Sequence, residues 1–94
     1  MSAERVAAAA VKVRGRVFTA GTHKEAAHAA ALALEILPIM AAAEIGPAEQ
    51  GFTTTRGRWL SRAEAWKLAK KRGQLRWDRS RPGITPELHS EDLR

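Results

Sequence analysis

The alternation of apolar and polar residues predicts a β-hairpin at the start of the chain. Residues 6–13 (VAAAAVKV) and 16–19 (RVFT) have the composition of strands, and Val11 and Val13 alternate with basic residues, as on a half-buried strand. Gly15 lies between two arginines and can adopt the positive φ of a tight turn. The pattern therefore places a hairpin turn at this glycine.

A helix is expected directly after this hairpin. Thr22 and Glu25 have the spacing of a capping box, in which each side chain satisfies an amide at the helix start. We expect the helix to run to about Leu37, because Pro38 lacks the amide needed to continue it. Nearly every position from Ala26 onward is apolar. Such a helix is either the central packing element or part of a subunit interface.

The same order of elements recurs in the second half of the chain. Residues 50–54 and 58–60 are expected to form a second hairpin with its turn at Arg56–Gly57. Between the two units, residues 38–49 contain Gly46 and Pro47 and are expected to be a turn or loop.

The second helix is expected to begin after Ser61, which forms a capping box with Glu64, and to run to Arg72. Gly73 follows as a left-handed stop. Its buried stripe consists of four residues: Ala65, Trp66, Leu68 and Ala69. Residues 74–77 are expected to form a final strand, and residues 78–87, with two prolines and a glycine, a loop.

Together these elements predict one α+β domain spanning residues 1–94, made of two β-hairpin–helix units. A small antiparallel sheet would pack on two helices. A chain of 94 residues is near the size at which core burial alone gives modest stability, so a partner chain could supply further burial.

Charge and cysteine content narrow the classes of partner. The formal net charge is +6, and eight of the 16 basic residues lie between Arg56 and Arg76. This balance favours polyanions or phosphorylated ligands, although such residues also occur simply as solvated surface. The chain has no cysteine, which excludes disulfides and thiolate zinc sites.

Membrane insertion and export are not expected. The apolar stretch from Ala26 to Ala43 approaches the length of a membrane span, but His28, Glu35 and Pro38 interrupt it. The N-terminal alanine run is interrupted by basic residues and does not resemble a secretory signal. A cytoplasmic protein without membrane contact is the expectation.

The pattern of chemical groups favours a binding protein over an enzyme. His23 and His28 are five residues apart and do not share a helix face as a metal pair would. The chain contains no nucleophile elbow and no P-loop. We therefore expect no catalytic residues, no bound metal and no cofactor.

The start of the first helix is a candidate anion site. Thr22, His23 and Lys24 lie where free amides and the helix dipole favour negative charge, and two of them add cationic or donor groups. The alternative is plain capping, in which the Glu25 carboxylate would compete with a bound phosphate.

Several aromatic residues are candidates for stacking on a nucleobase. Phe52, Trp59 and Trp77 lie close in sequence to arginines, among them Arg62. Trp66 is assigned to the core from its helical spacing. In so small a protein, Phe52 and Trp59 are also candidates for the core.

Six motifs occur in an order that resembles small phage and prophage proteins. They are a Thr-Gly-containing turn before a His, the tetrapeptide EQGF, a G-R-[FW] hairpin, a [DS]-R-x-E-A helix, a Gly-Gln end and a C-terminal SEDL. In this chain they are Phe18–His23, Glu49–Phe52, Gly57–Trp59, Ser61–Ala65, Gly73–Gln74 and Ser90–Leu93.

This order is similar to that of the first-described Thoeris anti-defence sponges. The resemblance implies a non-catalytic, oligomeric phage protein that sequesters a cyclic ADP-ribose-type nucleotide near subunit contacts. Two positions depart from the family pattern. Thr22 stands where the family tends to carry an arginine, and Arg94 stands where an aromatic residue is expected. Loss of that arginine removes one bidentate phosphate contact.

The binding residues predicted for such a sponge come from three segments. The helix start would contribute His23 and Lys24, and the carboxylates of the C-terminus would accept ribose hydroxyls. The full predicted set is Thr22, His23, Lys24, Gln50, Gly51, Phe52, Arg62, Ser90, Glu91 and Asp92. Alternatively, the acidic tail pairs with the lysines of the second helix.

Two other functions are alternatives to that of a sponge. A nucleic-acid-binding phage accessory protein would place the basic surface from Arg56 to Arg76 on the phosphate backbone, with strong salt dependence. An assembly module would use the apolar first helix to bind another copy and would hold no small ligand.

Overall fold

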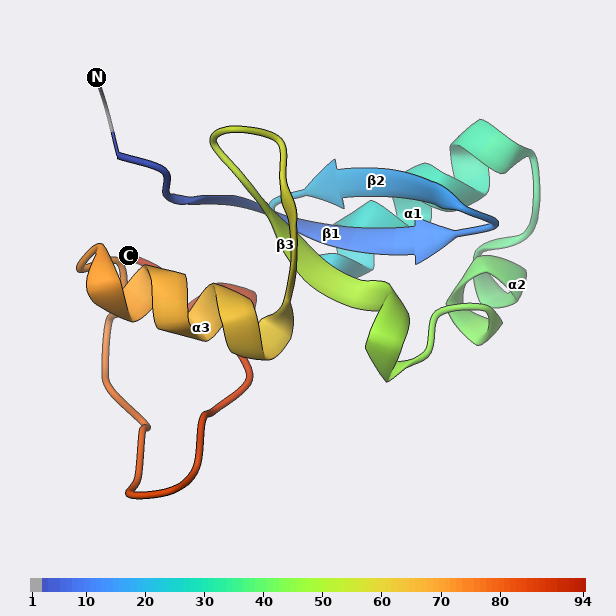
Figure 1. Ribbon diagram of the computed structural model, residues 1–94. Helices are drawn as coiled ribbons and strands as arrows, with labels where there is room; N and C mark the ends of the chain where they lie inside the picture. The colour runs from blue at the N-terminus through green and yellow to red at the C-terminus, as the bar shows by residue number, and fades with distance from the viewer. Residues whose placement is uncertain (1–2) are drawn as a thin grey trace.

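The computed structural model describes residues 3–94 and has a four-stranded antiparallel sheet of order β2-β1-β3-β4 (Figure 1). The strands are β1 (Val6–Val13), β2 (Arg16–Ala20), β3 (Gln50–Thr54) and β4 (Trp59–Ser61). The α-helices are α1 (His23–Leu34), α2 (Pro38–Ala43) and α3 (Arg62–Lys71), and the 3₁₀ turns are η1 (Pro47–Glu49) and η2 (Ser90–Asp92).

Both predicted hairpins form, and their first strands lie at the centre of the sheet. Gly15 and Gly57 each have φ of 77°, as the turns require. β1 then pairs with β3, so that Ala9 faces Phe52 and Ala10 faces Gly51. This pairing joins the two hairpin–helix units into one sheet and confirms the predicted α+β class.

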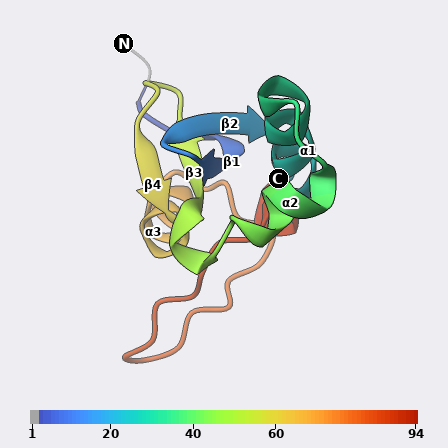
Figure 2. The same ribbon diagram turned by 90° about the vertical axis from the view of Figure 1, so that its right-hand side faces the viewer.

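The helices α1 and α3 cover the same face of the sheet. Ala9, Val11 and Val13 occupy every second position of β1, so their side chains all point to this face. Val11 and Val13 pack with α1, whereas Ala9 packs with Phe52 and Trp66 in the cluster beneath α3. Figure 2 shows α1 and α3 at opposite ends of the sheet.

The two predicted helix caps differ in detail. The Ser61 hydroxyl accepts a hydrogen bond from the Glu64 amide at 3.2 Å, and the Glu64 carboxylate accepts one from the Ser61 amide at 3.0 Å. Thr22 accepts from the Glu25 amide at 3.1 Å, but no hydrogen bond of the described residues runs from Thr22 N to the Glu25 carboxylate. The Glu25 carboxylate is therefore not used in capping.

The segment predicted as a loop, residues 38–49, contains α2 and η1 instead. The prediction that the first helix extends to Leu37 is also wrong, because Glu35 adopts a left-handed conformation with φ of 56° and ends α1 at Leu34. Pro38 is the first residue of α2. Proline is favoured at this position, since the amide it lacks would have no partner in the first turn.

The predicted final strand at residues 74–77 is absent. Gln74 instead uses its side-chain amide to bond both the N–H and the C=O of Val6, each at 2.9 Å. Leu75 forms a single isolated bridge with Leu93, and Arg94 N donates to Gln74 O at 2.8 Å. The C-terminal segment thus returns along α3.

Of residues 3–94, no helix combines the length and the apolar character needed to cross a bilayer.

On the face of the sheet that carries no helix, β3 and β4 make an unusually close contact. The Trp59 ring lies against the backbone of Gly51, and the Lys12 ammonium lies 4.3 Å from the centre of the same ring. A Cβ added at Gly51 would overlap the Leu60 carbonyl oxygen and lie 2.7 Å from Cζ2 of Trp59. Only glycine fits there without movement of the backbone.

Gly51→Ala should therefore lower the free energy of unfolding by about 1–3 kcal/mol, the usual cost of forcing extra atoms into a packed site. Chemical denaturation of both proteins measures this. Gly21→Ala is the matched control, because an added Cβ would meet only the Glu25 carboxylate at 3.7 Å, an ordinary contact. Equal stability of the two variants would contradict the proposed close approach.

The N-terminal segment is anchored by an ion pair. The buried Glu4 carboxylate accepts hydrogen bonds from Arg58 Nε at 2.8 Å and Nη2 at 2.7 Å and from the Thr54 hydroxyl at 2.6 Å. The Arg58 and Thr54 hydrogen bonds lower the pKa of Glu4 from 4.5 to about 2. Glu4 therefore ties the start of β1 to the second hairpin.

Because the folded-state pKa is lower than the unfolded one, the stability due to Glu4 is fully present above pH 4.5 and is lost as the pH falls toward 2. We expect Glu4→Gln to lower the melting temperature at neutral pH and to flatten its decline in this acid range. Thermal melts of both proteins across the pH series measure this. Parallel curves for the two proteins would refute the assignment.

Candidate functional site

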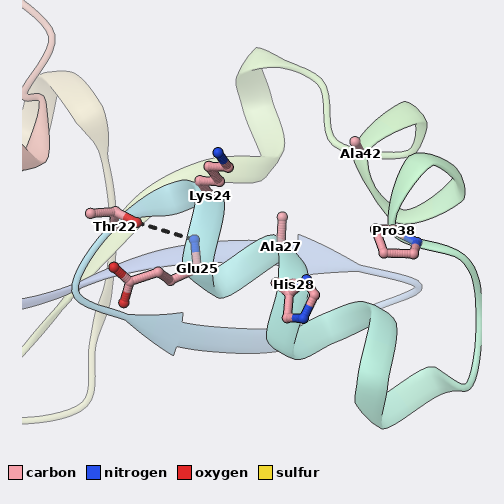
Figure 3. A pocket seen from close by; sticks show the side chains of 7 residues that line it. All are labelled: Thr22, Lys24, Glu25, Ala27, His28, Pro38 and Ala42. Atoms are coloured by element: carbon pink, nitrogen blue, oxygen red, sulfur yellow. Dashed lines mark hydrogen bonds between the residues drawn. The ribbon is translucent and has the colours of Figure 1, made fainter.

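A pocket of about 770 Å³ lies between α1 and α2 (Figure 3). In the figure, Ala27 of α1 points toward the side where α2 carries Ala42, and Lys24 stands near the start of α1. The lining residues are Thr22, Lys24, Glu25, Ala27, His28, Pro38 and Ala42. This volume is within the range of sites that bind small organic ligands.

A second pocket of about 200 Å³ adjoins the first and shares Lys24, Ala27 and Ala42 with it. It reaches His23 and Gln50 at the start of β3. We call the two pockets together the α1–α2 groove. One end of this groove is mainly apolar, and the other end carries polar and cationic groups.

His23 connects the groove to the sheet. Its Nε2 lies 2.7 Å from the Gly51 carbonyl oxygen, and its ring meets the Phe52 ring edge-to-face, with centroids 4.9 Å apart. Nε2 must donate in this bond, because a carbonyl oxygen only accepts. Phe52 is fully buried beneath His23, in agreement with the prediction that it belongs to the core.

Arg62, the first residue of α3, lines neither pocket itself but contacts Gln50, which lines the second one. Its guanidinium donates to the Gln50 side-chain oxygen at 2.8 Å, to the Leu88 carbonyl at 3.0 Å and to His89 Nδ1. All three acceptors are neutral. Within residues 3–94, no carboxylate lies within ion-pair distance of Arg62, so its positive charge is not compensated by an ion pair.

Burial lowers the pKa of His23 below its ordinary value of 6.5, and the nearby Arg62 and His89 add to this effect. The hydrogen bond to Gly51 acts in the opposite direction but is the weaker influence. His23 is therefore neutral at neutral pH and serves as a hydrogen-bond donor rather than as a cation. The positive charge of this end comes from Arg62 and Lys24.

Free backbone donors lie at the start of α1. The Glu25 amide is bonded to the Thr22 hydroxyl and the Ala26 amide to the Thr22 carbonyl. The amides of His23 and Lys24 have no acceptor among the described residues. The Glu25 carboxylate points away from the Lys24 ammonium (Figure 3) but lies near Gly21, at the same end of α1, so a bound anion would have to share this end with it.

The predicted C-terminal binding residues Ser90, Glu91 and Asp92 form η2 and do not line the groove. Asp92 is buried and accepts from Trp77 Nε1 at 2.7 Å, Arg79 Nη2 at 2.6 Å and the His89 amide at 2.8 Å.

Burial raises the pKa of Asp92, but these hydrogen bonds outweigh it and the net pKa is lowered. Asp92 thus remains ionised and holds His89 in place beside Arg62. The alternative prediction is that the acidic tail pairs with the lysines of α3. Asp92 does not do so, because its ion pair is with Arg79.

Of the predicted set, Thr22, His23, Lys24 and Gln50 line the groove. Gly51, Phe52 and Arg62 contact His23 or Gln50 but line neither pocket, and the fully buried Phe52 has no free face on which a base could stack. Sequence reasoning missed the groove residues Pro38 and Ala42 because it assigned α2 to a loop. It missed His28 of α1 because only the packing of α2 against α1 makes this residue part of a pocket. It also missed His89, for which proximity to the SEDL motif was the one available signal.

The fold and groove define a small α+β protein with a ligand-sized pocket that has a cationic end. The family model described as phage T4 y16D protein matches residues 5–93, and the chain belongs to this family. The predicted resemblance to small phage proteins is thereby confirmed at that level. No curated protein and no solved structure matches the chain.

The environment of His23 leads to a measurable titration. Its midpoint, followed by the ring proton signals in NMR, should lie below 6.5, and Arg62→Gln should raise it, because the variant removes a neighbouring positive charge. Because the folded pKa is the lower one, the His23 contribution to stability is present above pH 6.5 and declines as the pH falls through the folded-state midpoint. A midpoint that is unchanged in Arg62→Gln would exclude this electrostatic contact.

Proposed function

We propose that this phage protein captures a phosphorylated nucleotide of the cyclic ADP-ribose class in the α1–α2 groove and holds it without chemical change. The cationic end, with Lys24 and Arg62, would bind phosphate. The apolar end, between Ala27 and Pro38, would receive the base. In this role the protein acts as a sponge that lowers the free concentration of a signalling nucleotide.

The observation that carries the proposal is the uncompensated charge of Arg62. A guanidinium whose protein partners are all neutral gains from a nearby phosphate without first breaking an ion pair. The free amides at the start of α1 add donors, and its dipole favours negative charge at the same end. These groups belong to two helices, α1 and α3, so phosphate would be held from two sides.

Both imidazoles near the groove are fixed in orientation by hydrogen bonds. His23 Nε2 donates to the Gly51 carbonyl, and His89 Nδ1 accepts from Arg62. Each ring therefore has one nitrogen committed to a structural hydrogen bond. The second nitrogen of each ring stays available, as it is in a general base, so recovery of an unchanged ligand is the measurement that separates retention from reaction.

The alternative of a nucleic-acid-binding accessory protein uses the basic residues from Arg56 to Arg76. Two of these are engaged in ion pairs, Arg58 with Glu4 at 2.7 Å and Lys70 with Asp78 at 3.1 Å. Lys67 and Lys71 border a separate surface groove of about 380 Å³ on α3. Duplex DNA is therefore included as a ligand in the test below.

Isothermal titration calorimetry with cyclic ADP-ribose isomers tests the proposal. We expect saturable binding by the wild-type protein and an affinity about 10–100-fold lower in Lys24→Ala, the usual effect of losing a hydrogen bond to a charged group. Lys67→Ala, an exposed lysine outside the groove, should bind as the wild type does. The ligand released after heat denaturation should be chromatographically unchanged.

Three results would count against the proposal. Equal loss of affinity in Lys24→Ala and Lys67→Ala would place the ligand elsewhere, and recovery of a hydrolysed ligand would indicate an enzyme. Salt-sensitive binding to duplex DNA without binding of the nucleotide would favour the accessory protein.

A further inference from the structure

Four large apolar side chains are exposed around the turn from α1 to α2. Their exposed fractions are 70% for Leu32, 63% for Leu37, 75% for Ile39 and 45% for Met40. We call these residues the α1–α2 patch. Glu35 lies within the same stretch, is exposed and has no ion pair among residues 3–94. A concentration of exposed apolar surface in one place indicates an interaction site.

Another exposed apolar residue lies at the tip of a projecting loop. Residues 78–87, which we call the arm, extend away from the sheet and helices (Figure 1). Pro82 is followed by Gly83 with φ of 76°, and Ile84 N donates to Arg81 O at 3.0 Å, the features of a type II turn. Ile84 is 64% exposed at this tip.

The arm is held in place by hydrogen bonds at its base. Arg79 Nη2 donates to the Glu87 carbonyl at 2.8 Å and so links the two limbs. Lys70 of α3 pairs with Asp78 at 3.1 Å and donates to the Ser80 hydroxyl at 3.0 Å. A loop ordered in this way presents its tip with little further entropy loss on binding.

The arm and the α1–α2 patch lie at opposite ends of the molecule. In both Figure 1 and Figure 2 the arm projects at the lower left, whereas the α1–α2 turn is at the right. The molecule is 40 Å across its longest dimension. An arm therefore cannot cover the patch of its own chain, and contact between the two requires a second copy.

We propose that the arm tip of one copy docks on the α1–α2 patch of a second copy. Ile84 would be buried between Leu37 and Ile39, and Arg81 would pair with Glu35. The charges of the two surfaces are complementary, since Arg81 is exposed and also has no ion pair among the described residues. This inference does not depend on the nucleotide.

Contact between different surfaces on each copy is heterologous, so it continues from copy to copy until a ring closes or a filament grows. The patch borders Pro38 and thereby the groove. The arm of a neighbouring copy would therefore lie next to the apolar end of the groove.

Sedimentation analysis of two single variants and of their mixture tests this arrangement. The wild type should form an assembly larger than a dimer. Ile84→Asp and Ile39→Asp should each weaken the contact by at least about 30-fold, as expected for a central apolar anchor. An equimolar mixture should form a 1:1 dimer and nothing larger, because one intact arm and one intact patch remain.

Val17→Asp is the matched control, since Val17 is an exposed apolar residue on β2 outside both surfaces. It should assemble as the wild type does, and circular dichroism should show that all variants are folded. Arg81→Glu should weaken assembly by about two- to five-fold, and Glu35→Arg in the same chain should restore it.

A monomeric wild type at high concentration would overturn the proposal. So would assembly that persists in Ile84→Asp, which is the result expected if the patch packs on itself. A mixture of the two variants that stays monomeric would have the same consequence.

Discussion

The pairing of β1 with β3 is the interaction on which the rest of the structure depends. It joins two hairpin–helix units that are separate in sequence and sets the register in which Ala10 faces Gly51. That register places the Gly51 carbonyl at the start of α1, where His23 reaches it, and Gln50 at the start of α3, where Arg62 reaches it. A shift by one residue would turn the side chains of β3, Gln50 among them, to the other face of the sheet.

The shallow core of the first unit follows from its alanines. Ala26 and Ala30 are fully buried and bring α1 close to Val11 and Val13, but each buries little apolar area. The larger apolar residues of this region, such as Leu32 and Ile39, are exposed instead. The unit therefore gains less stability from its own core than its hydrophobic composition suggests, and the same composition leaves a groove beside α1.

Local signals were sufficient to predict most of the fold. The turn glycines Gly15 and Gly57 and the Ser61 cap act over a few residues, so their effects can be read from neighbouring positions. The missed features depend on distant contacts. Gln74 hydrogen-bonds Val6, which is 68 residues away in the sequence, and Arg62 hydrogen-bonds His89, which is 27 residues away. A periodic pattern in neighbouring residues carries no information on such pairs. The groove could not be predicted because α2 forms one of its walls. The alanines of α2 fit a helix, but the prolines and the glycine that flank them favour a loop.

The C-terminal segment and the groove are coupled through Arg62. Its guanidinium bonds the Leu88 carbonyl and His89 on one side and Gln50 on the other, while Leu88 N donates to Arg62 O at 3.0 Å. Asp92 fixes the same segment by accepting from the His89 amide. If an anion that binds Arg62 favours docking of residues 88–92, that docking raises the affinity for the anion by the same factor. The predicted role of the SEDL motif in ligand binding thus has a physical route through Arg62 that requires no direct contact between its carboxylates and the ligand.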